Sequence, residues 1–138
     1  MFEACENGET KVVQLLLECC SPEESGLNIK DIHGRTTLMI ACRNGHKDVV
    51  RLLLENSERN IDLNARSNGG STALMIACRH GHKDVVQLLL DNSERNIDLN
   101  ARCTFGWTAF NYARLFEFED VVKLLKEHSK TKGIDIST

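Results

Sequence analysis

The sequence predicts an all-α solenoid of stacked helix–turn–helix units with β-turn hairpin tips. Residues 31–66 return as residues 67–102, and only eight of the 36 positions differ between the two copies. Each copy holds two short apolar segments with helical spacing, separated by a glycine and followed by a polar stretch. Helices this short are not stable in isolation, so neighbouring pairs must bury each other's apolar faces, which produces a stack.

The same register extends over the chain of 138 residues, which we expect to form one array. Residues 103–138 continue it more loosely, and residues 1–30 match it with a shift of 37. The units are 1–30 (truncated), 31–66, 67–102 and 103–138, of which the middle two are called the inner units. Because the first unit lacks its turn, we expect an excerpt of a longer array or an array with worn ends. Lys126 replaces Leu54 and Leu90, which predicts a polar final helix suited to a C-terminal cap.

In the second unit, each element has its own local signal. The hydroxyl of Thr36 can accept an orphan backbone N–H and so start the first helix. Gly45 can adopt the positive φ that ends this helix. The apolar residues of 49–54 predict the second helix, which follows at once. The polar residues 56–62 predict a loop, and residues 63–66 predict extended chain that leads into the next turn.

The turn and the start of the first helix carry a recurring motif. It reads Gly34-Arg35-Thr36-Thr37-Leu38, Gly70-Ser71-Thr72-Ala73-Leu74 and Gly106-Trp107-Thr108-Ala109-Phe110. In the inner units an alanine, Gly-His and Val-Val-x-Leu-Leu-Leu follow. This pattern resembles the ankyrin repeat, whose usual signature is G-x-T-P-L-H-x-A-A, then G-H, V-V-x-L-L-L and D-V-N-A. The resemblance covers nearly the whole chain.

Three departures from that signature affect the loops and the helix ends. The signature proline and histidine are absent from all three turns. The unit has 36 residues, whereas an ankyrin repeat has about 33, and the excess falls in the polar loops. Glu117 replaces the glycine that ends the first helix, and we expect it to cost up to about 1 kcal/mol if the positive φ is kept.

The resemblance implies a non-enzymatic module that binds a partner protein or peptide on the concave surface formed by the turns and first helices. No catalytic residue, cofactor, metal site or small-molecule substrate is expected. The net charge of −3 argues against nucleic-acid binding by bulk charge. Two alternatives stay open, namely a structural or self-associating repeat segment and a targeting domain cut from a larger enzyme or adaptor.

The cysteines and the apolar runs bear on where the protein resides. No apolar run approaches the ~20 residues of a membrane helix, and we identify no signal peptide. The six cysteines lack the paired spacing of a zinc site. Cys42 and Cys78 occupy equivalent apolar helix positions, so we expect small buried thiols in a reducing compartment. This predicts a cytoplasmic protein, with the nucleus as an alternative.

Most of the eight differences between the inner units cluster in the turn before the first helix, and one lies at the end of that helix. They are Asp31/Ser67, Ile32/Asn68, His33/Gly69, Arg35/Ser71, Thr37/Ala73, Asn44/His80, Arg51/Gln87 and Glu55/Asp91. In ankyrin-like stacks these turns and first helices face the partner. The differences therefore indicate either diversification of a binding surface or free drift at exposed positions, and both interpretations stay open.

Basic side chains concentrate on the same predicted surface, although the chain as a whole is acidic. They are Lys30, Arg35, Arg43, Arg66, Arg79 and Arg102. A groove of this kind would attract acidic or phosphorylated peptide segments, because guanidinium groups bind carboxylates and phosphates in a bidentate manner. The alternative is that the arginines form solvated pairs with Asp31, Asp62 or Asp98, which contribute little energy.

The last unit adds aromatic residues where the earlier units are polar. Phe105 and Trp107 fall in its turn, and Leu115 and Phe116 fall at the end of its first helix. Exposed aromatics beside arginine are typical of an interface hot spot, whereas the alternative is local packing that caps the last unit together with Phe118. The predicted partner-binding residues are Ile32, His33, Arg35, Arg43, Asn44, Arg66, Asn68, Ser71, Arg79, His80, Arg102, Phe105, Trp107, Leu115 and Phe116.

Two further motifs receive a structural interpretation. His46-Lys47-Asp48 and its copy at 82–84 open helices, so we interpret them as structural rather than catalytic or metal-binding. Asn64 and Asn100 lie in Asp-Leu-Asn-Ala, which is similar to ankyrin asparagines modified by an oxygen-sensing hydroxylase. Hydroxylation at these two residues is therefore a candidate modification beside a plain structural role.

Overall fold

The computed structural model describes residues 1–20, 29–55, 61–92, 97–134 and 136. Within these ranges the chain has eight helices and no strand, which confirms the predicted all-α class. The helices are α1 (Phe2–Asn7), α2 (Thr10–Cys19), α3 (Thr37–Asn44), α4 (Lys47–Glu55), α5 (Ala73–Arg79), α6 (Lys83–Asp91), α7 (Ala109–Leu115) and α8 (Glu119–Lys132). None of these described helices is long and apolar enough to cross a membrane.

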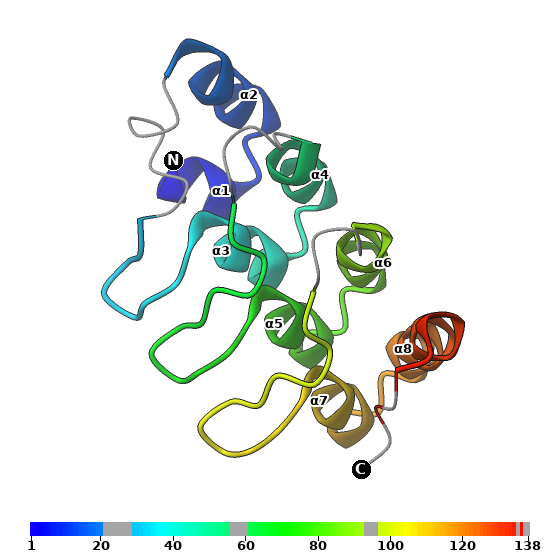
Figure 1. Cartoon of the computed structure of the whole chain (residues 1–138). Helices are drawn as coiled ribbons and strands as arrows, with labels where there is room; N and C mark the ends of the chain where they lie inside the picture. The colour runs from blue at the N-terminus through cyan, green and yellow to red at the C-terminus, as the bar shows by residue number, and fades with distance from the viewer. Residues whose placement is uncertain (21–28, 56–60, 93–96, 135, 137–138) are drawn as a thin grey trace.

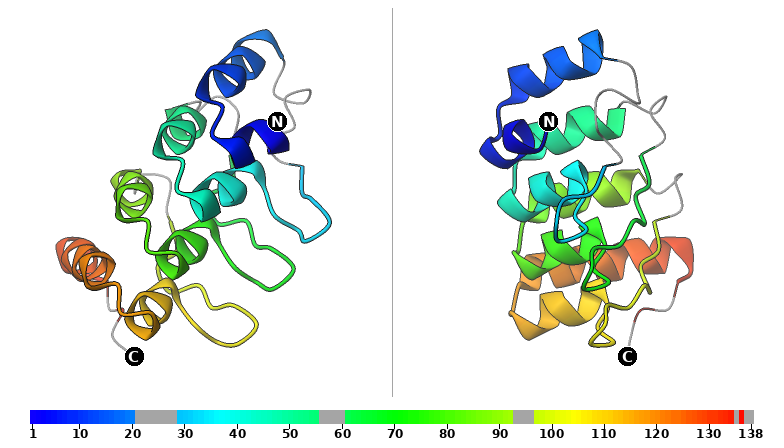
Figure 2. Two further views of the ribbon diagram at one scale, coloured as in Figure 1. Left: turned by 180° about the vertical axis from the view of Figure 1, so that it is seen from behind. Right: turned by 90° about the vertical axis from the view of Figure 1, so that its left-hand side faces the viewer.

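The helices form four pairs that stack in chain order, with the pair α1 and α2 at one end of the stack and the pair α7 and α8 at the other (Figure 1). The first helices α1, α3, α5 and α7 contact one another in one layer, and the second helices α2, α4, α6 and α8 form another. The hairpin tips extend from the first helices on the side away from the second helices (Figure 2). The tips and first helices together form what we call the tip–helix surface.

A threonine caps the start of each complete first helix. Thr36 accepts a hydrogen bond from the backbone N–H of Met39 at 3.3 Å, which confirms the predicted cap. Thr72 caps α5 in the same way. At Thr108 the cap is reciprocal, because the side chain of Asn111 accepts from the backbone N–H of Thr108 at 2.9 Å. Asn111 stands where the ankyrin signature has histidine, so this departure adds a hydrogen bond.

The residue that ends the first helix has a positive φ, as the sequence predicts. Gly45 follows α3 with φ 70°, a conformation that glycine adopts without a steric penalty. The equivalent Glu117 keeps this conformation with φ 60°, and among the described residues no other non-glycine has a positive φ. The expected local strain of about 1 kcal/mol therefore applies to the last unit.

One hydrophobic core runs through the stack from the first pair to the last. In α4 the side chains of Val49, Val50, Leu53 and Leu54 are buried, which confirms the predicted apolar face. The prediction of small buried thiols is confirmed for Cys5, Cys42, Cys78 and Cys103. It is wrong for Cys19, which is exposed, and for Cys20, which is only half-buried. Burial raises the pKa of Cys42 and of Cys78, so both remain neutral thiols.

The two histidines of the Gly-His motifs join successive units. His46 Nε2 donates to the backbone carbonyl of Glu6 at 2.8 Å, and His82 Nε2 donates to the carbonyl of Arg43 at 2.9 Å. Each ring lies against the helix-ending glycine of the preceding unit, so that a Cβ on Gly45 would approach His82 Nδ1 to 2.6 Å. In the described part of the chain, no cluster of His, Cys, Asp or Glu is arranged to hold a metal ion.

The chain between the helix pairs differs from the prediction at one place. Leu63 and Asn64 form a turn rather than extended chain, because the Asp62 side chain accepts from the Asn64 N–H at 2.9 Å and the Asp62 carbonyl accepts from the Ala65 N–H at 3.3 Å. The aspartate immediately before the turn, Asp62, is the local signal for it. Most of the predicted polar loop 56–62 lies outside the described residues.

Candidate partner-binding surface

Each tip is a tight hairpin closed by two backbone hydrogen bonds, as the sequence predicts. In the second unit the N–H of Asp31 donates to the carbonyl of Arg35 at 3.0 Å, and the N–H of Gly34 donates to the carbonyl of Asp31 at 2.9 Å. The same pair of bonds closes the tips at 67–71 and 103–107. The three tips therefore share one backbone arrangement, and they present equivalent positions of successive units.

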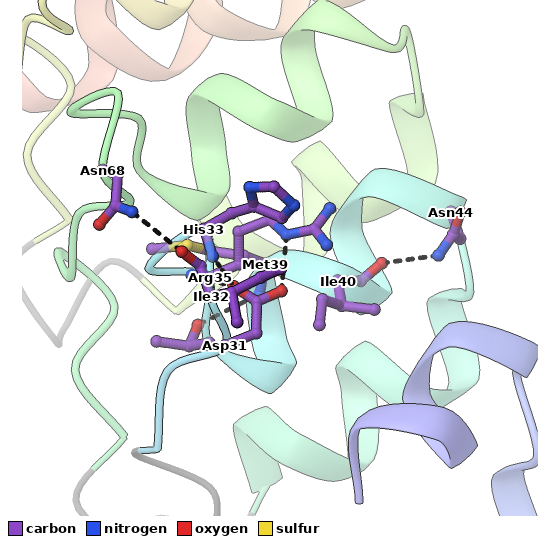
Figure 3. Close-up of polar contacts among 9 residues, drawn as sticks. Asp31, Ile32, His33, Arg35, Met39, Ile40, Asn44 and Asn68 are labelled. Carbon is purple, nitrogen blue, oxygen red and sulfur yellow. Dashed lines mark hydrogen bonds and ion pairs between the residues drawn. The ribbon is translucent and has the colours of Figure 1, made fainter.

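Hydrogen bonds also join each tip to the next. The N–H of Asn68 donates to the carbonyl of His33 at 3.0 Å, and the N–H of Thr104 donates to the carbonyl of Gly69 at 3.0 Å. The Asn68 side chain adds a bond to the carbonyl of Ile32 at 3.2 Å (Figure 3). The tips are consequently one connected ridge rather than separate loops.

Asp31 organises the tip of the second unit and forms an ion pair with Arg35, one of the predicted basic residues of the surface. Its carboxylate accepts from the Arg35 Nε at 2.9 Å and from the backbone N–H groups of His33 and Arg35 (Figure 3). Partial burial alone would raise the pKa of Asp31, but these hydrogen bonds and the charge of Arg35 outweigh it and lower the pKa below its usual value. For Arg35 the alternative of pairing with a neighbouring aspartate is confirmed.

A hollow of about 250 Å³ opens on the tip–helix surface and brings five of the predicted residues together. It combines residues of three successive units, from α3, α5, α7 and two tips. The predicted residues that line it are Arg35, Arg43, Ser71, Arg79 and His80. Ser67, Met75, Ile76 and Tyr112 complete the lining. No aspartate or glutamate is among these residues, so the wall carries no negatively charged side chain.

Positive charge in the hollow comes from Arg43 and Arg79. Both are exposed, and neither forms an ion pair with any carboxylate in the described ranges. His80 also lines the hollow, and its ring stacks on that of His82 with centroids 6.1 Å apart. Partial burial and then the charges of Arg79, His82 and Arg43 lower the pKa of His80 below its ordinary value.

A second, shallower depression of about 530 Å³ lies in the last unit. Trp107, Asn111, Arg114 and Leu115 line it. Trp107 packs edge-on against Tyr112 with ring centroids 5.2 Å apart, and Tyr112 in turn lines the hollow. Phe105 stands beside Trp107 and is 79% exposed, so the tip of the last unit offers apolar surface next to the arginines.

The two phenylalanines at the end of α7 have different roles. Phe118 packs against the core, and its ring lies where a Cβ on Gly81 would approach it to 2.6 Å. Phe116 contacts Phe118 but remains 46% exposed. Local packing therefore accounts for Phe118, whereas partner binding by Phe116 stays a prediction.

The remaining predicted residues line neither depression. Ile32, His33 and Asn68 lie exposed on the first two complete tips. Asn44 and Arg102 are exposed, and their side chains donate to the carbonyls of Ile40 and Gly106. Arg66 is exposed, and its backbone carbonyl accepts from Lys30 Nζ at 2.9 Å. Asn64 is half-buried and its side-chain oxygen accepts from the Asp98 N–H at 2.8 Å, whereas Asn100 is exposed. Hydroxylation at either asparagine stays a prediction.

Sequence reasoning missed several lining residues for which the aligned units held a signal. Tyr112 stands where the inner units have Ile40 and Ile76, and this change places a hydroxyl and a ring between the two depressions. Asn111 and Arg114 likewise replace a methionine and a cysteine of the inner units. Comparison of the last unit with the inner ones, column by column, would have identified all three.

The stack of helix pairs, the connected tips and the exposed tip–helix surface define a repeat solenoid of the binding-scaffold class. A family model described as ankyrin repeats (3 copies) matches residues 1–67 and 60–138. The chain therefore belongs to the ankyrin repeat family, whose members are generally protein–protein interaction modules rather than enzymes. Among curated proteins, none matches the sequence closely enough to identify a relative.

Proposed function

We propose that this chain is a non-enzymatic interaction module that binds an acidic segment of a partner protein across the tip–helix surface. The observation that carries the proposal is the hollow in which Arg43 and Arg79 are exposed without a described carboxylate partner. Acidic side chains of a partner would supply the missing counter-charges through charge-assisted hydrogen bonds. The aromatic tip at Phe105 and Trp107 supplies apolar contact area beside them.

The test uses labelled poly-L-glutamate and poly-L-lysine of equal length as probes, with fluorescence anisotropy as the readout. We expect wild-type protein to bind poly-L-glutamate with an affinity that falls as salt rises, and not to bind poly-L-lysine. Arg43→Glu combined with Arg79→Glu should abolish binding. Arg51→Glu combined with Lys83→Glu makes the same change of charge in α4 and α6, away from the hollow, and should retain it. Equal binding by the two double variants would overturn the proposal.

One observation favours a second candidate function, self-association. In α2 the side chains of Val12 and Leu15 are 40% and 58% exposed, whereas Val49 and Val85, which are equivalent to Val12, are buried against the preceding unit. A second copy of the chain could cover this apolar face.

Sedimentation equilibrium tests the second candidate. We expect the wild-type mass to rise above 15.5 kDa with concentration, and Val12→Lys with Leu15→Lys to remain at the mass of one chain. A wild-type protein that stays at one chain mass at every concentration would exclude self-association.

A further inference from the structure

The hollow has features that favour one kind of acidic group over another. Its two unpaired guanidinium groups, from Arg43 and Arg79, belong to adjacent units and carry two positive charges. The third arginine, Arg35, is already neutralised by Asp31 at 2.9 Å. The hollow therefore matches a group with two negative charges better than a carboxylate, which has one.

The other polar groups of the wall extend the donor set. Ser67, Ser71, Tyr112 and His80 line the same hollow. Tyr112 is buried and its hydroxyl lies 3.3 Å from Cys103 Sγ, so Ser67, Ser71 and His80 are the side chains that add donors. A tetrahedral group with three acceptor oxygens can use donors arriving from several directions, whereas a planar carboxylate uses them from fewer. The hollow of about 250 Å³ is also large enough for a phosphorylated side chain together with part of its backbone.

We infer that the hollow binds a phosphorylated side chain of the partner segment, with Arg43 and Arg79 as the principal ligands of the phosphoryl group. This inference rests on the proposed function and names the chemistry of the partner. The apolar depression at Trp107 and Leu115 lies next to the hollow through Tyr112, so it accommodates a hydrophobic residue close to the phosphorylated one.

The proton on His80 provides an independent readout of the anion. The groups that act on His80 are Arg79 on its own helix, Arg43 of α3 and His82 at the start of α6, and all of these are basic. Partial burial and then these neighbouring groups lower the pKa of His80 in the free protein, and a bound dianion must raise it. Binding is then accompanied by proton uptake at His80, so affinity gains a component that increases as the pH falls from 8 towards 6.

The first experiment compares three fluorescent peptide libraries with randomised flanks and a central phosphoserine, glutamate or serine. We expect wild-type protein to bind the phosphoserine library about tenfold more tightly than the glutamate library, with the serine library weakest. Equal affinity for phosphoserine and glutamate would overturn the phosphoryl inference while the acidic-segment function stands. A failure of poly-L-glutamate binding as well would remove both.

Two sets of variants show whether the hollow is responsible. Arg43→Lys with Arg79→Lys keeps both charges but loses the bidentate fork, so it should retain poly-L-glutamate binding and lose the preference for phosphoserine. Full retention of that preference would contradict binding by these arginines.

His80→Asn installs the residue that the second unit has at this position. Its loss of affinity for the phosphoserine peptide, relative to wild type, should be larger at pH 6 than at pH 8, because asparagine cannot take up a proton. Because the phosphate itself titrates with a pKa near 6, only the difference between the two proteins is interpreted, and an absent difference would overturn the role of His80.

Discussion

The inner units and the last unit share one fold but differ at the face turned towards the C-terminal end of the stack. Positions that are apolar and buried in the inner units carry polar or charged residues in the last one. The replacements are Met39 and Met75 by Asn111, Cys42 and Cys78 by Arg114, and Leu54 and Leu90 by Lys126. In an inner unit these positions are shielded by the next helix pair, whereas in the last described unit they meet solvent. The polar replacements on this face therefore occur in α7 as well as in α8.

The joints between units differ in a related way. At the inner joint, His82 packs under Gly45 and donates a hydrogen bond to the carbonyl of Arg43. At the last joint Phe118 occupies the equivalent place under Gly81. Its ring has no polar atom and packs against the core. The position beneath this glycine is therefore filled either by a ring that forms a hydrogen bond, as in His82, or by a purely apolar ring, as in Phe118.

The largest effect on stability is expected when the residues at the equivalent positions Cys78 and Arg114 are exchanged. Cys78 is fully buried, so Cys78→Arg places an unpaired charge in the core and should lower the free energy of unfolding by at least about 4 kcal/mol. Arg114→Cys is the matched control at the solvent-facing end. It loses the contact of the guanidinium over the Phe110 ring and should cost less than about 1 kcal/mol. Urea titration followed by circular dichroism measures both, and similar losses would refute the end-face interpretation.

The next largest effect is expected at the glycine of the inner joint. Gly45→Ala adds a Cβ 2.6 Å from His82 Nδ1 in a backbone conformation with φ 70°, so strain and steric overlap combine to a loss of about 3 kcal/mol. Gly133→Ala is the control, because it has the same φ region but nothing within 4 Å of the added Cβ. It should lose only about 1 kcal/mol of unfolding free energy. Equal losses of unfolding free energy in the two variants would show that the His82 ring moves aside at no energetic cost.

A gain in stability should follow when the last unit receives the glycine of the inner ones. Glu117→Gly relieves the positive φ of 60° and should raise the free energy of unfolding by about 1 kcal/mol. Glu117→Ala removes the charge but keeps the strain of the positive φ. Its melting temperature should therefore stay close to that of the wild-type protein. If alanine stabilised the protein as much as glycine, charge rather than backbone conformation would be the cause.

The smallest effect is expected from exchange of the rings themselves. His82→Phe converts the inner joint to the last one and loses one hydrogen bond to a carbonyl, which should cost about 0.5–1 kcal/mol. Phe118→His is the reverse exchange, and urea titration of both variants measures whether the two joints are interchangeable. A loss above about 3 kcal/mol in either variant would mean that each joint is specific for its ring.

Local rules were sufficient for most of the fold. The threonine cap at Thr36, the helix-ending Gly45 and the apolar face of α4 each depend on residues within a turn or two of each other, and the structure confirms them. Their repetition at a constant period indicates stacking, because a short helix pair cannot bury its own apolar face. The turn at Leu63 and Asn64 also depends on a local residue, Asp62, but the prediction of extended chain did not take its side chain into account.

The tertiary structure decided how groups from different units combine. The sequence placed Arg43 and Arg79 on one surface, but only the stacking of α3, α5 and α7 brings them, with Tyr112, around a single hollow. In the same way, the bond from His82 to the Arg43 carbonyl joins residues 39 positions apart. Distances between units depend on how side chains interlock across the whole interface, and the spacing of residues along the chain does not encode them.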